Sequence, residues 1–464
     1  MKYFFILGTN PTLSLAELAA VFNHGEFSLI QKNIAFLDID YEIRANIIKK
    51  IGGTIKFGLI HSELNSITTK DILKSVVSFS KSEKKQSKFN FGFSYYGKSK
   101  IYPVNSSITG ITPQSELSRG INLKILGMEF KKLLKLAGIN SRWVISRAPT
   151  LSSVVVEQNK LVTDKGAEIV MIEFNKKLFL GKTIAVQPFK ELSFRDYGRP
   201  ARDDRSGMLP PKLAQIMINL ALAPFLYQEE DWVKIVLDPF CGSGTIITEA
   251  LLMEQFHSLV KDGIMKRFHL IGSDISDQAI CNTKTNIEWI KKNYELQATS
   301  CELQATSCEP RATSCELRKI DATQISKQIQ PNSVDAIITE PYLGPQRNGF
   351  EIAKVVKDLE QLYSKSLMEF KKILKPMGRI VMIWPVFQKK SLSSRSNASD
   401  RGNLTNANIK GSLSPNLSGF KIINPIPANL QKNIFLKLTA RHTMIYGREK
   451  QRVWREIVVL EKHN

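Results

Sequence analysis

The second half of the chain has the pattern of an α/β fold with an open, mostly parallel sheet. Short apolar runs alternate with helical segments, and four runs end in an acidic residue, over 234–238, 268–274, 318–321 and 334–340. The first run leads at once into a glycine turn and an apolar helix, as in doubly wound sheets that bind ligands at the carboxyl ends of their strands. We therefore predict that these strand ends meet at one edge of one sheet and form a site there.

The glycine turn reads DPFCGSGT over residues 238–245. Gly242 and Gly244 let the backbone turn tightly and approach a ligand with no Cβ in the way. A plain strand-to-helix connection could contain the same glycines. However, Ile247 stands where a dinucleotide fingerprint would carry its third glycine, and no Gly-Lys-Ser/Thr follows to hold phosphates. We therefore expect a nucleoside ligand without phosphate groups.

The next two strands each end in a further carboxylate. Asp274 follows the strand 268–272, roughly thirty residues after the glycine turn, where an acidic residue would accept ribose hydroxyls. Asp274 could instead only cap the helix predicted over 277–293, since Asp and Ser are common helix caps. Asp321 ends the strand 318–322 and could accept an adenine amino group.

The fourth strand ends in Glu340-Pro341-Tyr342. A glycine turn followed by an acid-Pro-aromatic strand end resembles the S-adenosyl-L-methionine-dependent methyltransferases that methylate exocyclic amines of bases. The chain departs from their Asp/Asn-Pro-Pro-Tyr/Phe signature, because Glu340 replaces the first residue and only one proline follows. In an ungapped comparison, Leu343 falls on the aromatic position, and a shift of one residue gives Tyr342 that place.

The resemblance implies catalytic roles for Glu340, Pro341 and Tyr342. The Glu340 carboxylate or the Pro341 carbonyl would accept an N–H of the amine, and Tyr342 would stack on the base. The alternative is that the proline merely ends the strand, which it cannot continue. No metal is required. The cofactor would be S-adenosylmethionine, bound by Asp238, Phe240, Gly242, Gly244, Asp274 and Asp321.

The chain is strongly basic, and its excess charge is concentrated toward the N-terminus. The formal net charge is +22, and residues 1–190 hold 27 basic and 14 acidic residues, or +13 in two-fifths of the chain. This balance favours a polyanionic partner, because neutralising phosphates releases counterions. No run of eighteen apolar residues could cross a membrane, and the apolar run 3–7 is too short for a signal core. The five cysteines make no disulfide framework, which fits a reducing cytoplasm.

The first 190 residues predict two α+β modules. Residues 1–65 alternate as β-α-β-β-α-β, a ferredoxin-like order, with helices over 14–22 and 41–51 and a capping box from Ser14 to Glu17. The next module is predicted to contain helices over 70–80 and 116–137 and strands near 89–95, 142–147, 152–156, 167–173 and 178–186. Phe91, Phe93 and Tyr95 alternate along one of these strands and are expected to face the core, with a base-stacking platform as the alternative.

Two segments extend the resemblance to a narrower family. MKYFFILGTNPTLSLAELAAVF at residues 1–22 and RPARDDRSGMLPPKLA at 199–214 are similar to the tRNA guanosine N2-methyltransferases that act at position 10 of tRNA. The resemblance implies that Met208 to Pro211 line the methionine end of the cofactor, and some family members use a small activating subunit. The implied domains are a ferredoxin-like N-terminal module (1–65), a THUMP domain holding the tRNA acceptor end (66–190), a linker (191–205) and a Rossmann-like seven-stranded methyltransferase domain (206–464) that closes with strands near 434–446 and 452–461.

Two insertions interrupt the second half. Residues 295–315 are three copies of a seven-residue repeat ending in ATSC, too few and too polar for a coiled coil. Their cysteines lack the short paired spacing of a zinc site, so we expect a tolerant loop. Residues 391–419 are rich in Ser and Asn and are expected to form a mobile loop.

The sequence as a whole predicts methylation of the N2 amine of a tRNA guanosine, at position 10. A DNA amino-methyltransferase would use the same pocket, but residues 1–190 do not look like a DNA target-recognition domain. A non-catalytic RNA-binding protein with a decayed pocket is a further alternative, favoured by the altered strand end at 339–343.

Overall fold

The computed structural model describes most of the chain, and all structural statements below concern those residues. The residues outside it are 66–67, 77–87, 98–100, 103–120, 203–206, 227–231, 255–265, 295–313, 346–350, 389–408, 448–450 and 463–464.

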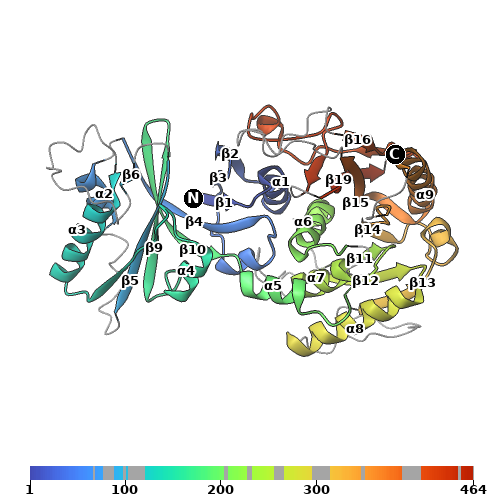
Figure 1. Cartoon of the computed structure of the whole chain (residues 1–464), viewed down its shortest axis with the longest axis horizontal. Coiled ribbons are helices and arrows are strands. Elements are labelled where there is room, and N and C mark those ends of the chain that lie inside the picture. Colours follow the sequence, from blue (N-terminus) through green and yellow to red (C-terminus); the bar gives the residue numbers. More distant parts are fainter. Residues whose placement is uncertain are drawn as a thin grey trace. The chain divides into compact units, whose positions relative to one another are not determined.

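The described residues form two compact units, each built on its own sheet (Figure 1). The first unit contains residues 1–9, 24–48 and 54–189, and the second contains residues 10–23, 49–53 and 190–464. Helix α1 (Pro11–Val21) therefore belongs to the second unit, although the sequence placed it in an N-terminal module.

The first unit contains an eight-stranded sheet in the order β2-β3-β1-β4-β10-β9-β5-β8. Its first four strands pair antiparallel and have the order of a ferredoxin-like sheet. The strands are β1 (Lys2–Leu7), β2 (Glu26–Gln31), β3 (Ile34–Asp38), β4 (Thr54–Leu64), β5 (Phe89–Tyr96), β8 (Ser141–Val144), β9 (Gly166–Phe174) and β10 (Lys177–Val186), beside a separate pair of β6 (Ile101–Tyr102) and β7 (Ile121–Asn122).

Two predictions for the first half of the chain are wrong. The strand expected near 152–156 is helix α4 (Ser153–Gln158), because the Ser152 side chain accepts a hydrogen bond from the Val155 amide and caps a helix there. This local cap outweighs the strand propensity of three consecutive valines. The helix expected over 41–51 is only the short 3-10 helix η1 (Ala45–Lys49).

The aromatic residues of β5 face the core, as predicted. Phe91, Phe93 and Tyr95 are 0%, 5% and 2% exposed, and they pack with helices α2 (Thr69–Val76) and α3 (Leu123–Leu136). The predicted helix 116–137 corresponds to α3, although residues 116–120 lie outside the described part. Burial of these rings excludes a base-stacking role for this face.

The second unit contains the predicted parallel sheet. The sheet has nine strands where seven were expected: seven lie on the central path β13-β12-β11-β14-β15-β19-β17, and β16 and β18 pair at its side. The pairs from β13 to β15 are parallel, whereas β19 runs antiparallel to β15. The strands are β11 (Trp232–Asp238), β12 (Lys266–Asp274), β13 (Ser314–Lys319), β14 (Val334–Thr339), β15 (Leu374–Gln388), β16 (Ile409–Ser412), β17 (Phe420–Ile422), β18 (Met444–Tyr446) and β19 (Val453–Lys462).

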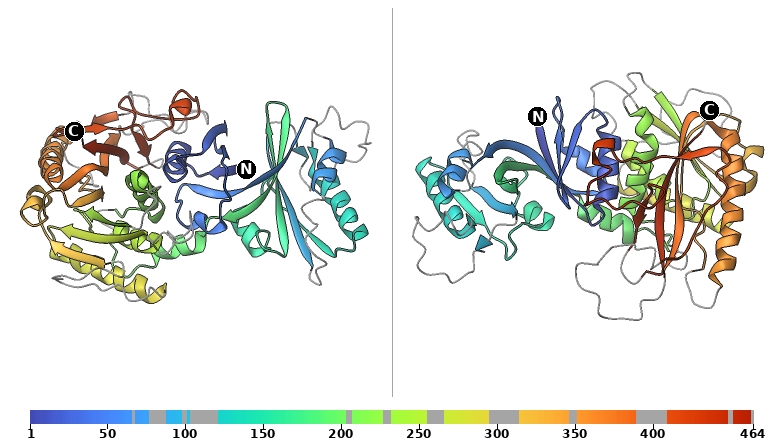
Figure 2. Two further views of the ribbon diagram at one scale, coloured as in Figure 1. Left: turned by 180° about the vertical axis from the view of Figure 1, so that it is seen from behind. Right: turned by 90° about the horizontal axis from the view of Figure 1, so that it is seen from above.

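Helices cover this sheet and connect its strands. Helix α9 (Ile352–Ile373) packs along η6 (Ala322–Lys327), β15 and β16 and runs beside the sheet of its unit (Figure 2). The sequence identified neither α9 nor the long strand β15. The remaining helical segments are α5 (Phe189–Tyr197), α6 (Pro211–Leu222), η4 (Ala223–Phe225), α7 (Thr245–Glu254), α8 (Asp277–Asn293), η6 (Ala322–Lys327), α9 (Ile352–Ile373) and η9 (Ala428–Leu430).

Glu17 of α1 ties three segments of the second unit together. Its carboxylate accepts hydrogen bonds of 2.8 Å from the Gly52 amide, the Gly53 amide and the Asn219 side chain of α6. The predicted capping box is therefore wrong. Helix α1 already begins at Pro11, so Ser14 and Glu17 lie inside it and are free to bond to residues 49–53 and α6.

Some residues of both predicted insertions belong to strands of the sheet. Ser314 and Cys315, the end of the repeat, begin β13, and Cys315 is 2% exposed. Residues 409–412 of the second insertion form β16, which pairs with β15. Of the closing strand expected near 434–446, only β18 forms, and Leu438 makes an isolated bridge to Met444 before it. Within the described residues, we find no helix that combines the length and apolar character needed to span a membrane.

Candidate active site

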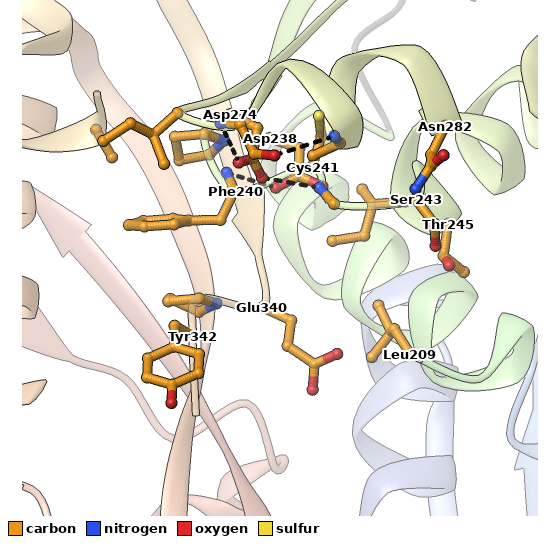
Figure 3. A pocket seen from close by; sticks show the side chains of 18 of the residues that line it. Leu209, Asp238, Phe240, Cys241, Ser243, Thr245, Asp274, Asn282, Glu340 and Tyr342 are labelled. Atoms are coloured by element: carbon orange, nitrogen blue, oxygen red, sulfur yellow. Dashed lines mark hydrogen bonds between the residues drawn. The ribbon is translucent and has the colours of Figure 1, made fainter. Parts of the chain in front are cut away.

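A cavity of about 510 Å³ lies at the carboxyl edge of the parallel strands, where the sequence placed the site. Figure 3 shows the glycine turn with Asp238 and Asp274 on one side of it and Glu340 with Tyr342 on another. The cavity is lined by Gly207, Met208, Leu209, Asp238, Pro239, Phe240, Cys241, Gly242, Ser243, Thr245, Ile246, Asp274, Ile275, Ser276, Gln278, Ala279, Asn282, Asp321, Ala322, Glu340, Pro341, Tyr342, Leu343 and Leu362.

Asp238 ends β11 and is buried beneath the glycine turn, with 2% exposure. It accepts hydrogen bonds from the Thr339 hydroxyl at 2.8 Å and the Phe240 amide at 3.2 Å. Burial, with smaller contributions from the nearby Asp274 and Glu340 carboxylates, raises the pKa of Asp238 to about 8, although its two hydrogen bonds oppose the shift. Asp238 therefore joins the ends of β11 and β14 across the floor of the cavity.

Asp274 ends β12 and holds the glycine turn. Its carboxylate accepts hydrogen bonds from the Gly242 amide at 3.1 Å and from the Ser276 amide at 3.0 Å. Helix α8 is capped by Ser276, whose hydroxyl accepts a bond from the Ala279 amide. The helix-capping alternative for the segment Asp274-Ile275-Ser276 therefore holds for Ser276, whereas the Asp274 carboxylate bonds to the glycine turn and to the Ser276 amide.

The two glycines of the turn differ in position. Both have a positive φ, 54° for Gly242 and 79° for Gly244. A Cβ at Gly242 would have open space, and this residue lines the cavity. A Cβ at Gly244 would lie 2.6 Å from the Thr283 side chain, and Gly244 is not part of the lining. Gly244 is therefore required for packing against α8, and of the two glycines only Gly242 lines the cavity.

Asp321 also lines the cavity, next to the end of β13. Its carboxylate accepts hydrogen bonds of 2.8 Å from the amide and the hydroxyl of Thr323 and so caps the start of η6. Of the segment before α6, Met208 and Leu209 line the cavity. Pro210 caps α6 and Pro211 begins it, so this part of the segment is a proline helix start.

Glu340 extends from the end of β14 and pairs with an arginine that the sequence reading did not identify. The Arg455 Nε donates a hydrogen bond of 2.5 Å to the Glu340 Oε1, and the two side chains are 10% and 13% exposed. Burial raises the pKa of Glu340, while Arg455 opposes this shift. Arg455 lies on β19, 115 residues further along the chain, so no local pattern indicates the pair.

The aromatic residue at the strand end is Tyr342. Its side chain is 56% exposed and lines the cavity, whereas Leu343 is only 7% exposed. The Tyr363 hydroxyl of α9 donates a hydrogen bond of 2.9 Å to the Tyr342 carbonyl and fixes this turn. Tyr342 therefore has an exposed ring that could stack on a base. Figure 3 shows the Phe240 ring as a second aromatic group beside the same pocket.

Other cavity residues had no signal in the sequence. Gln278 and Asn282 line it from α8, and Leu362 lines it from α9. A helical period of three or four residues after Asp274 could have indicated the first two. In the described part of the chain, no group of three or more His, Cys, Asp or Glu side chains is arranged to hold a metal ion.

Most of the parallel sheet and its cavity lie in a region that matches a known domain family. Residues 199–414 match the family described as RMKL-like, methyltransferase domain. This region contains the glycine turn, Asp274, Asp321 and Glu340, and the cofactor of such a domain is S-adenosylmethionine.

Two relatives are tRNA (guanine(10)-N2)-dimethyltransferases. The chain is 24% identical to that of Pyrococcus abyssi (strain GE5 / Orsay) over 219 residues, 47% of this chain and 50% of the relative. It is 27% identical to that of Methanocaldococcus jannaschii over 195 residues, 40% of this chain and 44% of the relative. The chain thus matches about half the length of these relatives. Among solved structures, TrmN from Thermus thermophilus aligns over 100% of both chains with 16% identity and a TM-score of 0.45.

Proposed function

We propose that the protein methylates the N2 amine of a guanosine in tRNA, at position 10, with S-adenosylmethionine as methyl donor. One observation carries this proposal. The same cavity contains Asp274, a carboxylate at the position that accepts ribose hydroxyls, and Glu340, a buried carboxylate that can accept an N–H of the amine. The names of the two relatives support guanine N2 as the atom and position 10 as the site.

The cofactor side of the cavity fits a nucleoside. Its volume of about 510 Å³ is within the usual range for small-molecule sites. The Gly242 backbone faces open space, and Asp274 keeps lone pairs free beside its two amide donors, so it can accept ribose hydroxyls. In this proposal Asp321 accepts the adenine amino group, and Asp238 and Phe240 shape the floor and wall. The bound cofactor supplies a methyl group activated by a sulfonium.

The acceptor side would position the amine. Glu340 accepts one N–H of the guanine amine, Pro341 offers its carbonyl for the other, and Tyr342 stacks on the base. The amine lone pair then points toward the methyl group, and fixing this geometry makes the reaction effectively unimolecular. Once the nitrogen has bonded to the methyl group, its excess proton passes to Glu340 and from there to solvent.

The first unit would bind the RNA. Residues 1–190 carry +13 of the total charge of +22, and this excess favours contacts with phosphates. We propose that residues 66–190 act as a THUMP domain on the acceptor end of tRNA. A tRNA substrate also implies a cytoplasmic protein. If a small activating subunit exists, adding it should raise the methylation rate of the purified protein several-fold.

The test is nucleoside mass spectrometry of unmodified tRNA after incubation with the purified protein and S-adenosylmethionine. We expect N2-methylguanosine or N2,N2-dimethylguanosine, absent when guanosine 10 is replaced by adenosine. Methylated adenosine alone, or methylation of DNA alone, would favour the DNA amino-methyltransferase. RNA binding without cofactor binding would favour the decayed pocket.

A further inference from the structure

Arg455 connects two parts of the cavity wall from a strand that does not line the cavity. It extends from β19, donates through Nε to Glu340 at the end of β14, and donates through Nη2 to the Met208 carbonyl at 3.5 Å. Met208 and Glu340 both line the cavity. Arg455 itself is 8% exposed. The residue therefore contacts the acceptor carboxylate from behind while it also fixes the segment that enters α6.

The surroundings of Glu340 explain why a cation is needed. A buried carboxylate is costly unless a cation and hydrogen bonds compensate it. Among the described residues, Asp238 of β11 and Tyr363 of α9 also interact electrostatically with Glu340, and neither of them supplies a positive charge. Arg455 of β19 supplies the compensating charge. The Arg455 guanidinium opposes the effect of burial and so favours the ionised form of Glu340, which accepts hydrogen bonds and has no proton to donate.

Guanine and adenine present different atoms to such a group. Guanine places the N1–H and the N2 amine side by side, so its edge offers two adjacent donors. Adenine places its N6 amine beside N1, which is an acceptor. An ionised carboxylate accepts at both oxygens and donates at neither, whereas an amide offers one acceptor and one donor. Oε1 has a second lone pair beside the Arg455 bond, and Oε2 has both of its lone pairs for a ligand in the cavity.

We propose that Arg455 is a positioning residue that keeps Glu340 ionised and directed, so that the pocket selects guanine by its two adjacent donors. This inference rests on the proposed function. It assigns base discrimination to an ion pair between β14 and β19, a pair that lies partly beyond the residues of the family match, which ends at 414.

The first experiment compares two tRNA substrates that carry guanosine or 2-aminopurine riboside at position 10. The analogue keeps the 2-amino group but has an acceptor at N1. We expect the unaltered protein to prefer guanosine by about 10–100-fold in kcat/KM, the effect of one hydrogen bond to a charged group. Glu340→Gln should reduce this preference to a few-fold, because its amide can donate to N1 of the analogue.

The second experiment tests Arg455 through the pH dependence of kcat. Arg455→Met leaves Glu340 buried without its cation, so the carboxyl group should stay protonated to a higher pH. We expect kcat to fall by about 10–100-fold at pH 7 and to recover at least partly toward pH 9. Arg455→Lys should keep part of the rate. The affinity for S-adenosylmethionine should stay within about three-fold in all three proteins.

Arg379→Met is a matched control. Arg379 also joins a carboxylate, that of Glu461 on β19, and a backbone carbonyl, that of Leu220, but neither of these partners lines the cavity. Its removal should leave the pH profile and the guanine preference unchanged. A double-mutant cycle adds a direct criterion: Arg455→Met should cost less than three-fold in a Glu340→Gln background, because Arg455 would then have no charge to hold.

Two results would overturn the inference. One is an Arg455→Met protein that retains the wild-type pH profile and the guanine preference. The other is a full additional loss in the Glu340→Gln background, which would make Arg455 act independently of Glu340. If the unaltered protein methylates no guanosine, the proposed function itself fails, and the two failures are thereby distinguished.

Discussion

Two carboxylates in one cavity wall are compensated in different ways. Asp238 accepts two hydrogen bonds from neutral donors, and burial raises its pKa to about 8. Glu340 has an arginine, which opposes the effect of burial. Near neutral pH, Asp238 is therefore largely protonated and able to donate, while Glu340 is the better acceptor. This difference fits their places in the cavity: Asp238 joins two strands at its floor, and Glu340 is placed to accept an amine at its wall.

Substitution of Glu340 tests its role in methyl transfer. Glu340→Gln keeps an acceptor oxygen and should retain part of the rate, whereas Glu340→Ala should lose about 10²–10⁴-fold. S-adenosylmethionine affinity, measured by calorimetry, should hardly change in either variant. Glu340→Ala also leaves Arg455 buried without its partner, so unfolding should be measured in parallel. Near-normal turnover by the alanine variant would leave the Pro341 carbonyl as the acceptor.

Glu17 gives a pH dependence of stability. Burial raises its pKa from 4.5 to about 7, although three N–H donors oppose the shift. The folded protein thus binds this proton more tightly than the unfolded chain, so the contribution of Glu17 is complete below about pH 4.5 and is lost as the pH rises through about 7. Between these values, the unaltered protein should lose about 3 kcal/mol relative to Glu17→Gln. Denaturant unfolding at several pH values measures this, and parallel curves for both proteins would refute it.

At the scale of elements, the sequence predicted what is encoded locally. The strand ends at Asp238, Asp274 and Glu340 were identified because an apolar run followed by a polar residue is visible within ten residues. The Arg455 pair was not, because its partners are brought together only by the antiparallel strand β19. Likewise, Ser14 and Glu17 had the pattern of a capping box, but partners distant in the sequence use both side chains.

The boundary of β13 predicts which part of the repeat is dispensable. Replacing residues 295–313 by a short Gly-Ser linker should leave activity and melting temperature nearly unchanged, since loop length costs only about 0.6 kcal/mol per doubling. Replacing 295–315 by the same linker should be destabilising, because it removes the buried Cys315 and two residues of β13. Thermal unfolding of both proteins decides the matter. Loss of methyl transfer in the first variant, with its fold intact, would make the repeat a functional element.

At the scale of the whole molecule, each unit is built from three separate segments of the sequence, so no single boundary divides the chain into the two units. A truncation before residue 191 would remove α1 and residues 49–53, which belong to the second unit. Leu13, Leu15 and Leu18 of α1 are fully buried, and α1 packs on α6. The sequence suggested an RNA-binding half and a catalytic half that folds independently. Because α1 belongs to the second unit, we do not expect the catalytic half to keep its fold when residues 1–190 are removed.

Deleting residues 1–190 should accordingly destabilise the second unit. Each leucine lost from the buried face of α1 removes roughly 1.5–3 kcal/mol, and S-adenosylmethionine binding should weaken with the fold. As a comparison, Lys131→Gln with Lys135→Gln changes two exposed charges of α3 and leaves α1 in place. These two changes should reduce the salt dependence of tRNA binding with an unaltered melting temperature. Full cofactor affinity of the truncated protein would show that the second unit needs no N-terminal residues.

The bond between Glu17 and Asn219 spans 202 residues. During synthesis at about 5–20 residues per second, roughly 10–40 seconds pass between the emergence of the two partners. For that time the apolar face of α1 has no helix to cover it, and the carboxylate has no amide from α6. The leucine surface of α1 in the nascent chain therefore stays uncovered by α6 until the ribosome has completed that helix.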